Sequence, residues 1–495
     1  MLVNPNSEVA GENTAYSRFV PPVASAGIAY IAALLEKEGN DVMIVDQYAN
    51  KMTNEQLLRK IYIEKPQIIG FSCLTPTIKN VERLVIQIKK SNKEVRIVLG
   101  NTHATIFVEE LLNKKIADIV VRGEGEYTML EIIKAIEQKR ELHHVEGVSF
   151  VENGKVFHNP DRKVVENLDE LPYPAWYLFN LQLYKNHPLV SLYEITLPIQ
   201  GSRGCPYQCI FCSQEWMYKK SRYRQINNII SEIEYIHNKL GVKNFVFIDA
   251  FFPFSIEYGL EFCDKLIQKG LHKKVKWVIE TRVDKVNFKL LKKMKEAGLH
   301  LIMYGFEVGN QRVLDSLNKR TTLEQARKAM KDTRRAGIRT TGLFILGMPG
   351  ETKETCEETI RFAKELDCDI AKFNLAVPLP GSRFFEVYKD KLSDIGIPEK
   401  FTSWSSWLAD NDSLAYVPEG MTAKELINLQ TKAMFKYYVG PKLIIRCIVK
   451  RIISPKVLYY GAYVLIIKYF KIIIARITKI INLKERCDER HTYKP

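Results

Sequence analysis

Residues 194–215 read EITLPIQGSRGCPYQCIFCSQE, an apolar run that predicts a strand, followed by a loop with three cysteines. Cys205, Cys209 and Cys212 occupy eight residues, and the next cysteine along the chain is Cys263. The run opens a series of alternating strand and helix patterns, and parallel α/β barrels carry their chemistry on the loops that follow their strands. The position of the cysteines therefore predicts a functional loop.

Three thiols this close together fit three kinds of site. A zinc ion takes four ligands, but the next histidine, His237, lies inside a helical pattern. Structural cysteines in a core would not account for the glycine, proline and aromatic residues around them. A [4Fe–4S] cluster held by three cysteines leaves its fourth iron open for a further ligand. The missing fourth cysteine is thus a coordination position that a substrate or cofactor can occupy.

The series that begins at residue 194 predicts six strands, and a helical stretch follows each of the first five. The strands cover residues 194–200, 244–248, 275–281, 300–306, 340–346 and 371–377. Six units are fewer than a closed eight-unit barrel needs. We therefore expect a partial (β/α)6 barrel over residues 191–395, with its site at the carboxyl ends of the strands.

The first 145 residues also alternate short apolar runs with helical patterns, which is typical of a doubly wound, Rossmann-like parallel sheet. Ligands of such sheets bind beyond the carboxyl ends of the strands. The residues expected there are small or polar: Asn4, Asp46, Ser72, Gly100 and the stretch 122–124. Residues 146–190, with a hairpin pattern VSFVENGKVFHN, are predicted to form a linker.

Composition indicates a folded protein from a reducing compartment. The chain has 495 residues, of which 46% are hydrophobic, and its nine cysteines show no regular spacing outside the cluster. The N-terminus lacks the pattern of a secretory signal, so we expect a cytoplasmic protein. The net charge of +16 is concentrated in the tail, because residues 426–484 hold twelve Lys or Arg and no acid. A nucleic-acid-binding face on the main body is therefore not expected.

The end of the chain is predicted to be helical, as a cap over residues 396–440 and a basic amphipathic tail over 441–495. The longest uncharged run of the tail, Val457 to Ile467, has eleven residues, whereas a membrane-spanning helix needs about 20. Two interpretations remain: a helix that lies on an anionic membrane surface, or a buried C-terminal helix pair whose basic groups are solvated.

The spacing C-x3-C-x2-C, with an aromatic residue before the third cysteine, resembles the radical S-adenosylmethionine (SAM) superfamily. The stretches MKEAGLHLIMYGFEVGNQRVLDSLNK, RRAGIRTTGLFILGMPGETKET and FNLAVPLPGS resemble its later strand regions. The resemblance implies that Cys205, Cys209 and Cys212 are the catalytic, metal-ligating residues of a [4Fe–4S] cluster. SAM would chelate the open iron and be cleaved reductively to methionine and a 5′-deoxyadenosyl radical.

The resemblance also implies SAM contacts at the strand ends. The expected residues are Phe211, Asp249, Arg282, Glu307 and Gly347. The alternative interpretations are surface salt bridges for Arg282 and Glu307 and a simple turn for the glycine. Relatives carry a pair of acids after the second strand where this chain reads Asp249-Ala250, so one expected contact there is lost.

The front domain resembles the cobalamin-binding domain of the B12-dependent radical SAM class through FSCL (71–74), VLGNTHAT (98–105) and VVRGEGE (120–126). The residues implied at the cofactor are Ser72, Leu74, Thr75, Gly100, His103 and Glu124. No histidine precedes His103, so a loop histidine below the cobalt is not expected. His103 itself either contacts the corrin or its tail, or caps a helix start. A front domain that acts only as a scaffold is the alternative.

Residues 1–390 look most like the branch that contains anaerobic magnesium-protoporphyrin monomethyl ester cyclase. Methylation of an unactivated carbon in a hydrophobic substrate is the first expectation, and oxidative cyclisation of a porphyrin-like substrate is the second. A non-catalytic iron–sulfur regulatory protein is the third. The expected partners are a small hydrophobic molecule, an electron donor such as flavodoxin or ferredoxin, and a membrane surface for the tail.

Overall fold

The computed structural model describes residues 1–7, 22–185, 194–218, 220–392 and 414–438. Residues 1–431 form one compact unit and residues 432–495 a second. The first unit contains a seven-stranded front sheet and a six-stranded barrel sheet. The predicted amphipathic tail, 441–495, lies outside the described residues, as do residues 396–413 and 439–440 of the predicted cap. No helix within the described ranges is long and apolar enough to cross a membrane.

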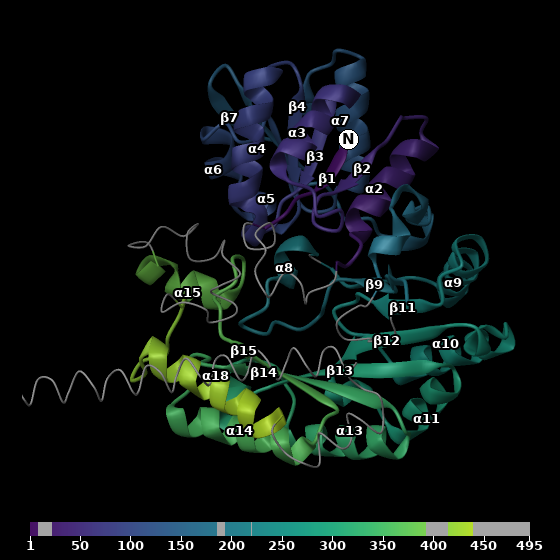
Figure 1. Cartoon of the computed structure of the whole chain (residues 1–495), viewed down its shortest axis with the longest axis vertical. Helices are drawn as coiled ribbons and strands as arrows, with labels where there is room; N and C mark the ends of the chain where they lie inside the picture. Colours follow the sequence, from purple (N-terminus) through teal and green to yellow (C-terminus); the bar gives the residue numbers. More distant parts are fainter. Residues whose placement is uncertain (8–21, 186–193, 219, 393–413, 439–495) are drawn as a thin grey trace, which may run out of the picture. The chain divides into compact units, whose positions relative to one another are not determined.

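Seven strands form the front sheet in the order β2-β1-β3-β4-β5-β6-β7 (Figure 1). The parallel strands are β1 (Leu2–Asn4), β2 (Ile44–Asp46), β3 (Ile68–Ser72), β4 (Arg96–Gly100) and β5 (Ile119–Val121). An antiparallel hairpin follows, formed by β6 (Val148–Glu152) and β7 (Lys155–His158). The sequence placed this hairpin in the linker, but its first strand pairs with β5 and extends the front sheet.

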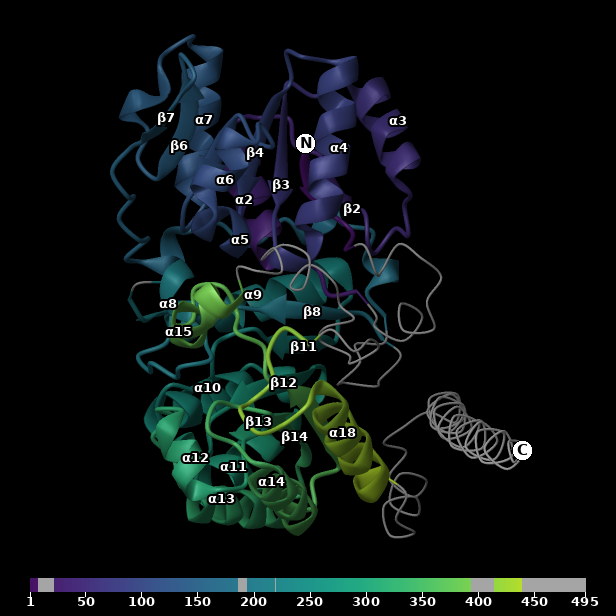
Figure 2. The same ribbon diagram turned by 90° about the vertical axis from the view of Figure 1, so that its left-hand side faces the viewer.

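Helices cover both faces of the front sheet, as the doubly wound prediction requires. On one face, α3 (Asn54–Glu64), α4 (Ile78–Ser91) and α6 (Val108–Asn113) share a core with alternate strand residues such as Val3, Ile69 and Leu99. On the other face, α2 (Ala26–Lys37) packs beside α7 (Glu126–Glu137). Figure 2 shows α3 and α4 side by side. The strands alternate buried residues between the two faces because successive side chains of a strand point in opposite directions.

Six parallel strands form the second sheet in the order β15-β14-β13-β12-β11-β8. They are β8 (Thr196–Ile199), β11 (Asn244–Phe247), β12 (Lys276–Thr281), β13 (Leu299–Glu307), β14 (Arg339–Leu346) and β15 (Ile370–Leu375). The first and last strands of this order do not pair with each other, so the sheet does not close into a full barrel. The partial barrel predicted from the sequence is confirmed. Each strand lies within three residues of its predicted range.

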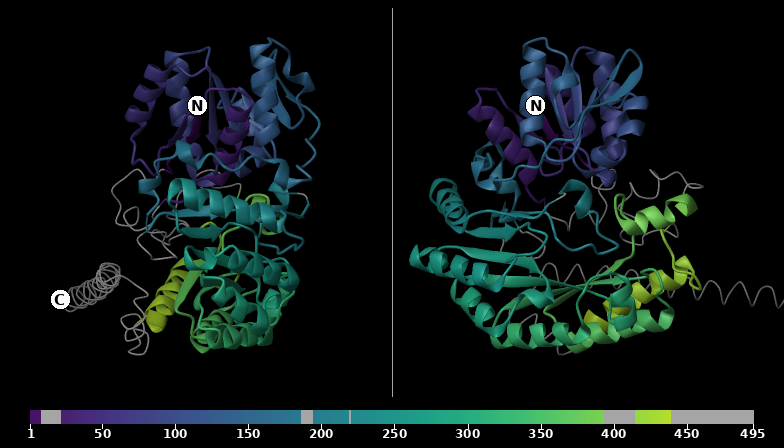
Figure 3. Two further views of the ribbon diagram at one scale, coloured as in Figure 1. Left: turned by 90° about the vertical axis from the view of Figure 1, so that its right-hand side faces the viewer. Right: turned by 180° about the vertical axis from the view of Figure 1, so that it is seen from behind.

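The helices that follow the barrel strands line the outer side of this sheet (Figures 1 and 3). They are α9 (Ile226–Leu240), α10 (Ile256–Gln268), α11 (Phe288–Glu296), α13 (Leu323–Arg335) and α14 (Lys353–Leu366). Two further helices, α15 (Arg383–Leu392) and α18 (Ala423–Tyr438), come after the last strand. Because helices occupy the outer side, the carboxyl ends of the strands and their loops are free to build a site.

Candidate functional site

The three cysteines lie on one loop, residues 204–221, called here the cysteine loop. It is closed by a short antiparallel ladder, called the neck, in which β9 (Ser202–Arg203) pairs with β10 (Arg222–Tyr223). Gly204 begins the loop with a φ of +86°, and a Cβ atom there would lie 2.5 Å from the carbonyl oxygen of Lys220. Only glycine lets the two ends of the loop approach this closely.

The three thiols share one environment. Each cysteine is half-buried and forms no disulfide, and the amide of Cys212 donates to the carbonyl of Cys209 at 3.1 Å. Burial raises the pKa of Cys212 to about 11, and the neighbouring charges of Cys209 and Cys205 add to the rise. Iron would supply the positive charge that such a group needs in order to ionise.

The donor set fits a cluster better than a single ion. No group of three or more His, Cys, Asp or Glu side chains in the described ranges is arranged around one metal ion. In a [4Fe–4S] cluster each thiolate binds a different iron, so the sulfurs stand further apart than around one ion. The chemistry of three cysteine thiols on one loop, each able to bind a different iron, therefore suits the cluster.

A buried ion pair lies beside the thiols. Glu307 ends β13 with a φ of +64°, and its carboxylate contacts the ammonium group of Lys319. Burial raises the pKa of Cys209, and the positive charge of Lys319 offsets part of that rise. Burial, and then the charge of Glu307, raise the pKa of Glu280 on β12 to about 7. Glu307 was predicted here, whereas Lys319 and Glu280 were missed.

The sequence held a signal for only one of the two missed residues. Glu280 is an acid within the apolar strand pattern VKWVIET, and an acid in such a run invites a functional interpretation. Lys319 follows a short helix, α12 (Gln311–Ser316), in the stretch LNKR, where it resembles an ordinary surface lysine. Its burial, with 7% exposed, is visible only in the fold.

Arg282, predicted to bind the SAM carboxylate, is held by protein groups. Its guanidinium lies over the ring of Tyr207 at 3.5 Å and donates from Nε to Asp284 at 2.9 Å. A second nitrogen donates to the carbonyl of Lys319 at 2.9 Å. Arg282 therefore ties the cysteine loop to the strand ends, because Tyr207 lies between the first two cysteines.

Asp249, the predicted contact after β11, fixes the turn between β8 and the neck. Its carboxylate accepts a hydrogen bond from the amide of Gly201 at 3.0 Å and one from the hydroxyl of Ser202 at 2.5 Å. Burial raises the pKa of Asp249 to about 6, while these hydrogen bonds lower it. Phe211 packs against an apolar cluster that includes Val308.

Gly347 was expected to lie at the SAM site. It has a φ of +83°, and a Cβ atom there would lie 2.6 Å from the side chain of Leu426 on α18. Its amide donates to the carboxylate of Glu351 at 2.7 Å. The space beside Gly347 is thus filled by the helix that follows the barrel.

A cavity of about 240 Å³ opens at the carboxyl ends of the front strands. Five glycines contribute to its lining, which are Gly27, Gly70, Gly100, Gly123 and Gly125. Ser72, Gly100 and Glu124, three of the residues predicted at cobalamin, also line it. Walls made by glycine backbone let a flat aromatic group approach closely, so the cavity suits part of cobalamin, such as the base of its tail.

Leu74, Thr75 and His103 are not among the residues that line this cavity. Leu74 is 42% exposed. His103 is buried, hydrogen-bonds through Nδ1 to the hydroxyl of Thr75 at 3.1 Å, and packs its ring at a tilt against that of Phe107. Burial lowers the pKa of His103 to about 3. The helix-cap interpretation of His103 is wrong, because Asn101 caps α5 (Thr102–Ile106) through its own side chain.

Glu124 meets the neck of the cysteine loop. Its carboxylate pairs with Arg222 at 2.7 Å and with Arg203 at 3.4 Å. Burial raises the pKa of Glu124, but the hydrogen bonds from Arg222 and the charge of Arg203 hold it below its ordinary value. The predicted cofactor contact is therefore also an ion-pair partner of the barrel.

One short helix joins the two candidate cofactor sites. α8 (Gln214–Met217) begins two residues after Cys212, and Met217 and Tyr218 at its end line the cavity of the front domain. Four helical residues span about 6 Å. The segment that contains α8 therefore lies next to the thiols at its start and against the cavity at its end.

Comparisons with known proteins agree with this geometry. The model of the radical SAM superfamily matches residues 199–363, and that of the B12 binding domain matches residues 18–133. An uncharacterized methyltransferase of Pyrococcus horikoshii is 32% identical over 431 residues, which are 86% of this chain and 89% of the relative. The anaerobic magnesium-protoporphyrin IX monomethyl ester cyclase of Rubrivivax gelatinosus is 33% identical over 400 residues, 79% of this chain and 70% of the relative.

A solved structure shares the fold. The radical SAM methyltransferase TsrM from Kitasatospora setae, with cobalamin and a [4Fe–4S] cluster bound, superposes with a TM-score of 0.65 at 16% identity. The match covers 80% of this chain and 75% of that one.

Proposed function

The chain belongs to the radical SAM enzymes that carry a B12-binding domain, and from this membership we propose that it transfers a methyl group to an unactivated carbon of a hydrophobic small molecule. It is an enzyme of this class, and its cofactors are a [4Fe–4S] cluster, SAM and cobalamin. When bound, the cluster supplies the electron that cleaves SAM, and cobalamin supplies a methyl carrier.

The observation that carries the proposal is the position of α8 between the two sites. Cys212 lies two residues before its first residue, and Met217 and Tyr218 lie at its end, against the cavity. A carbon activated near the cluster must meet a methyl group before it reacts with anything else, so the two sites have to be close and fixed. One helical turn between them meets this requirement.

The chain's own residues divide the work between these sites. We assign the three cysteines to the cluster, and Glu307 and Lys319 to the polar part of SAM, since these charged groups lie beside the thiols. Arg282 and Asp249 act as positioning residues, because their side chains are engaged by the cysteine loop and the turn before it. Glu280 remains available as a further polar contact.

Apolar side chains near both sites support a hydrophobic substrate. Ile248 is 39% exposed and lines the cavity, and Leu74 is 42% exposed after β3. Ile210 and Phe211 of the cysteine loop belong to an apolar cluster with Val308. A water-poor passage between the sites would also protect a radical from side reactions.

The test is anaerobic reconstitution of the full chain with iron, sulfide and hydroxocobalamin, followed by SAM labelled in its methyl group and a strong reductant. We expect 5′-deoxyadenosine, and transfer of the label to a component of a hydrophobic extract. Cys205→Ala, Cys209→Ala and Cys212→Ala should each abolish the brown colour and SAM cleavage, whereas Cys263→Ala, buried in α10, should keep both. No 5′-deoxyadenosine from a chain loaded with four irons would refute the proposal.

Oxidative cyclisation of a porphyrin-like substrate is the second candidate, and the 33% identity to the Rubrivivax gelatinosus cyclase favours it. The same labelling experiment separates the two reactions. A product that gains no methyl label but loses hydrogen would show that the reaction is an oxidation and not a methylation.

We further propose a cytoplasmic location, reduction by flavodoxin or ferredoxin, and peripheral membrane contact through the basic tail. The twelve Lys or Arg without an acid in residues 426–484 support the membrane contact. Co-sedimentation of the full chain with anionic but not with zwitterionic vesicles is expected. Equal binding to both kinds of vesicle, or to neither, would contradict it.

A further inference from the structure

Two arginines stand opposite each other in the neck of the cysteine loop. Arg203 of β9 and Arg222 of β10 are direct cross-strand partners. Each side chain is only 3% exposed. Like charges directly opposite in a ladder repel each other, and burial removes the water that would screen them. The neck therefore needs counter-charges in order to close.

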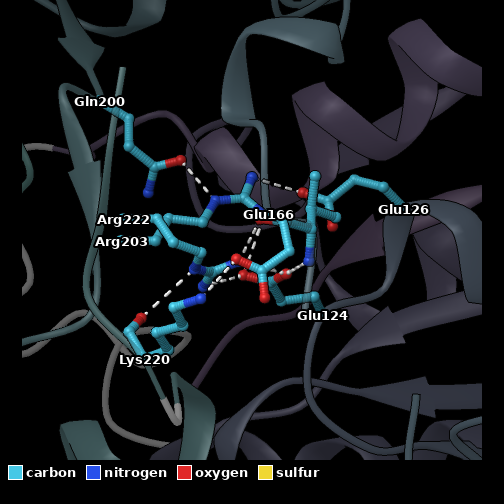
Figure 4. Close-up of polar contacts among 8 residues, drawn as sticks. Glu124, Glu126, Glu166, Gln200, Arg203, Lys220 and Arg222 are labelled. Carbon is cyan, nitrogen blue, oxygen red and sulfur yellow. Dashed lines mark hydrogen bonds and ion pairs between the residues drawn. The ribbon is translucent and has the colours of Figure 1, made fainter. Parts of the chain in front are cut away.

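The counter-charges come from the front domain, as Figure 4 shows. Glu124 accepts hydrogen bonds from both terminal nitrogens of Arg222, at 3.0 and 2.7 Å. Glu126, the first residue of α7, accepts one from Arg203 at 2.6 Å. Both glutamates are buried, with side chains 6% and 4% exposed. Among the described residues, these two supply the carboxylates that pair with the neck arginines.

The barrel contributes neutral partners to the same arginines. The side-chain oxygen of Gln200 accepts from Nε of Arg203 at 2.8 Å. The carbonyl of Lys220 accepts from Nε of Arg222 at 3.3 Å. Neutral acceptors satisfy the hydrogen-bonding groups but do not offset two buried positive charges. Closure of the neck thus depends on the docked front domain.

The middle of the cysteine loop is held by the barrel. The amide of Ile210 donates to the carbonyl of Leu317 at 3.1 Å, and the side chain of Asn318 donates to the carbonyl of Gln208 at 2.8 Å. The barrel therefore holds the middle of the loop, whereas the neck that closes both of its ends depends on front-domain carboxylates. Cys205 and Cys212 lie between the middle and the neck, and Cys209 lies at the barrel contact itself.

We propose that Glu124 and Glu126 are positioning residues for the iron–sulfur site, so that the front domain shapes the cysteine loop as well as lining the cavity. This inference rests on the proposed function only in that the loop carries a cluster. It gives the acidic stretch RGEGE, predicted above as a cofactor contact, a second role. Docking of the front domain then becomes a condition for a correctly shaped cluster site.

The first test uses the cluster-free full chain and hydrogen exchange. In Glu124→Gln we expect the amides of residues 204–221 to exchange at least about tenfold faster, because one buried arginine loses its partner. The amides of α10 and α11 should keep their protection. The control is Glu131→Gln, which removes the carboxylate that pairs with Arg162 within the front domain and should leave the loop unchanged. Glu124→Asp, which keeps the charge, should restore part of the protection.

The second test uses the reconstituted chain and the electron paramagnetic resonance spectrum of the reduced cluster. Glu124→Gln should shift the g values and lower the iron content, because Arg222 of the neck loses its carboxylate partner. A role in domain stability alone would lower the melting temperature without moving the spectrum.

Three results would overturn the inference. They are unchanged exchange in residues 204–221, loss of cobalamin with an unaltered cluster spectrum, and loss of protection throughout the chain, which would make Glu124 a determinant of the whole fold. Failure of the proposed function is a separate outcome, since it would appear as absent SAM cleavage in the unaltered chain.

Discussion

The carboxylate of Glu307 and the ammonium group of Lys319 form a buried pair next to the cysteine thiols. Both side chains are only 9% exposed. A buried pair is costly to break, because removing one partner leaves the other charge without water or a counter-ion. The pair therefore places two opposite charges side by side where SAM is proposed to bind.

Replacing one partner should cost more than replacing both. We expect Lys319→Met to lower the free energy of unfolding by about 3 kcal/mol, and the double variant Lys319→Met with Glu307→Gln to recover most of this loss. Denaturant unfolding of the cluster-free chain, followed through the fluorescence of the buried Trp277, measures both. Equal losses in the single and double variants would show that the two charges are not coupled.

His103 makes the stability of the front domain depend on pH. Its folded pKa of about 3 lies below the value of 6.5 of an unperturbed histidine. The unfolded chain therefore binds a proton first as the pH falls, and each pH unit below 6.5 costs up to about 1.4 kcal/mol until the folded pKa is reached.

Between pH 6.5 and 5 we expect His103 alone to lower the free energy of unfolding by about 1.5 kcal/mol. Denaturant unfolding at several pH values, compared between the unaltered chain and His103→Gln, isolates this contribution from that of the carboxylates. A pH dependence that is identical in the two chains would contradict the assignment.

Single residues differ in how much of their role the sequence reveals. The cysteines are predictable, because three thiols at a fixed spacing are informative by themselves. The partners of Arg282 are not, since Tyr207 and Lys319 reach it only after folding. Contacts between distant segments leave no local pattern.

At the scale of elements, the neck depends on one glycine. Gly204 combines a φ of +86° with a close approach to the carbonyl of Lys220, whereas Gly241 at the end of α9 has a φ of +68° and open space around it. Alanine would cost about 1 kcal/mol of backbone strain at either position. Only at Gly204 would the added methyl group also collide with backbone.

Gly204→Ala should therefore lose most of its iron after reconstitution, and Gly241→Ala should keep it. The measurement is iron and sulfide per chain after gel filtration, with the melting temperature recorded for both variants. Similar iron content in the two variants would mean that the neck tolerates the extra atom and does not control the loop.

Element by element, the sequence predicted the strands well and one sheet edge badly. The barrel strands are continuous apolar runs bounded by helices, so their pattern is local. The hairpin β6–β7 was recognised as a hairpin, but its pairing with β5 joins residues 119–121 to 148–150. Which edge a hairpin joins depends on the packed sheet rather than on the hairpin itself.

At the scale of the whole molecule, Glu124 and Arg222 couple the front domain to the barrel across 98 residues of sequence. The order of the two domains was predictable from their motifs. The ion pair that couples them was not predictable, because Glu124 or Arg222 considered alone suggests a solvated side chain or a cofactor contact. The compact unit of residues 1–431 instead buries both charges together.

The cavity at the carboxyl ends of the front strands should be the place where cobalamin is held. Gly100 ends β4, and a Cβ atom there would meet only Val121 at 3.8 Å, an ordinary contact. Valine is favoured in strands, so Gly100→Val should fold while its methyl groups reduce the cavity. We expect hydroxocobalamin to bind at least about tenfold more weakly. The added methyl groups would keep the cofactor from the cavity wall, and its packing contacts with that wall would be lost.

Gly100→Ala, with a smaller addition, should give an intermediate affinity. Cobalamin absorbance retained after gel filtration, together with the melting temperature of the full chain, measures this series. Gly100 and Arg203 line the same cavity, but Gly100 has no side chain that pairs with the neck arginines. Iron content should therefore stay constant in both variants. If Gly100→Val retains cobalamin as the unaltered chain does, the cofactor does not use this cavity, and the role of the front domain reduces to holding the cysteine loop.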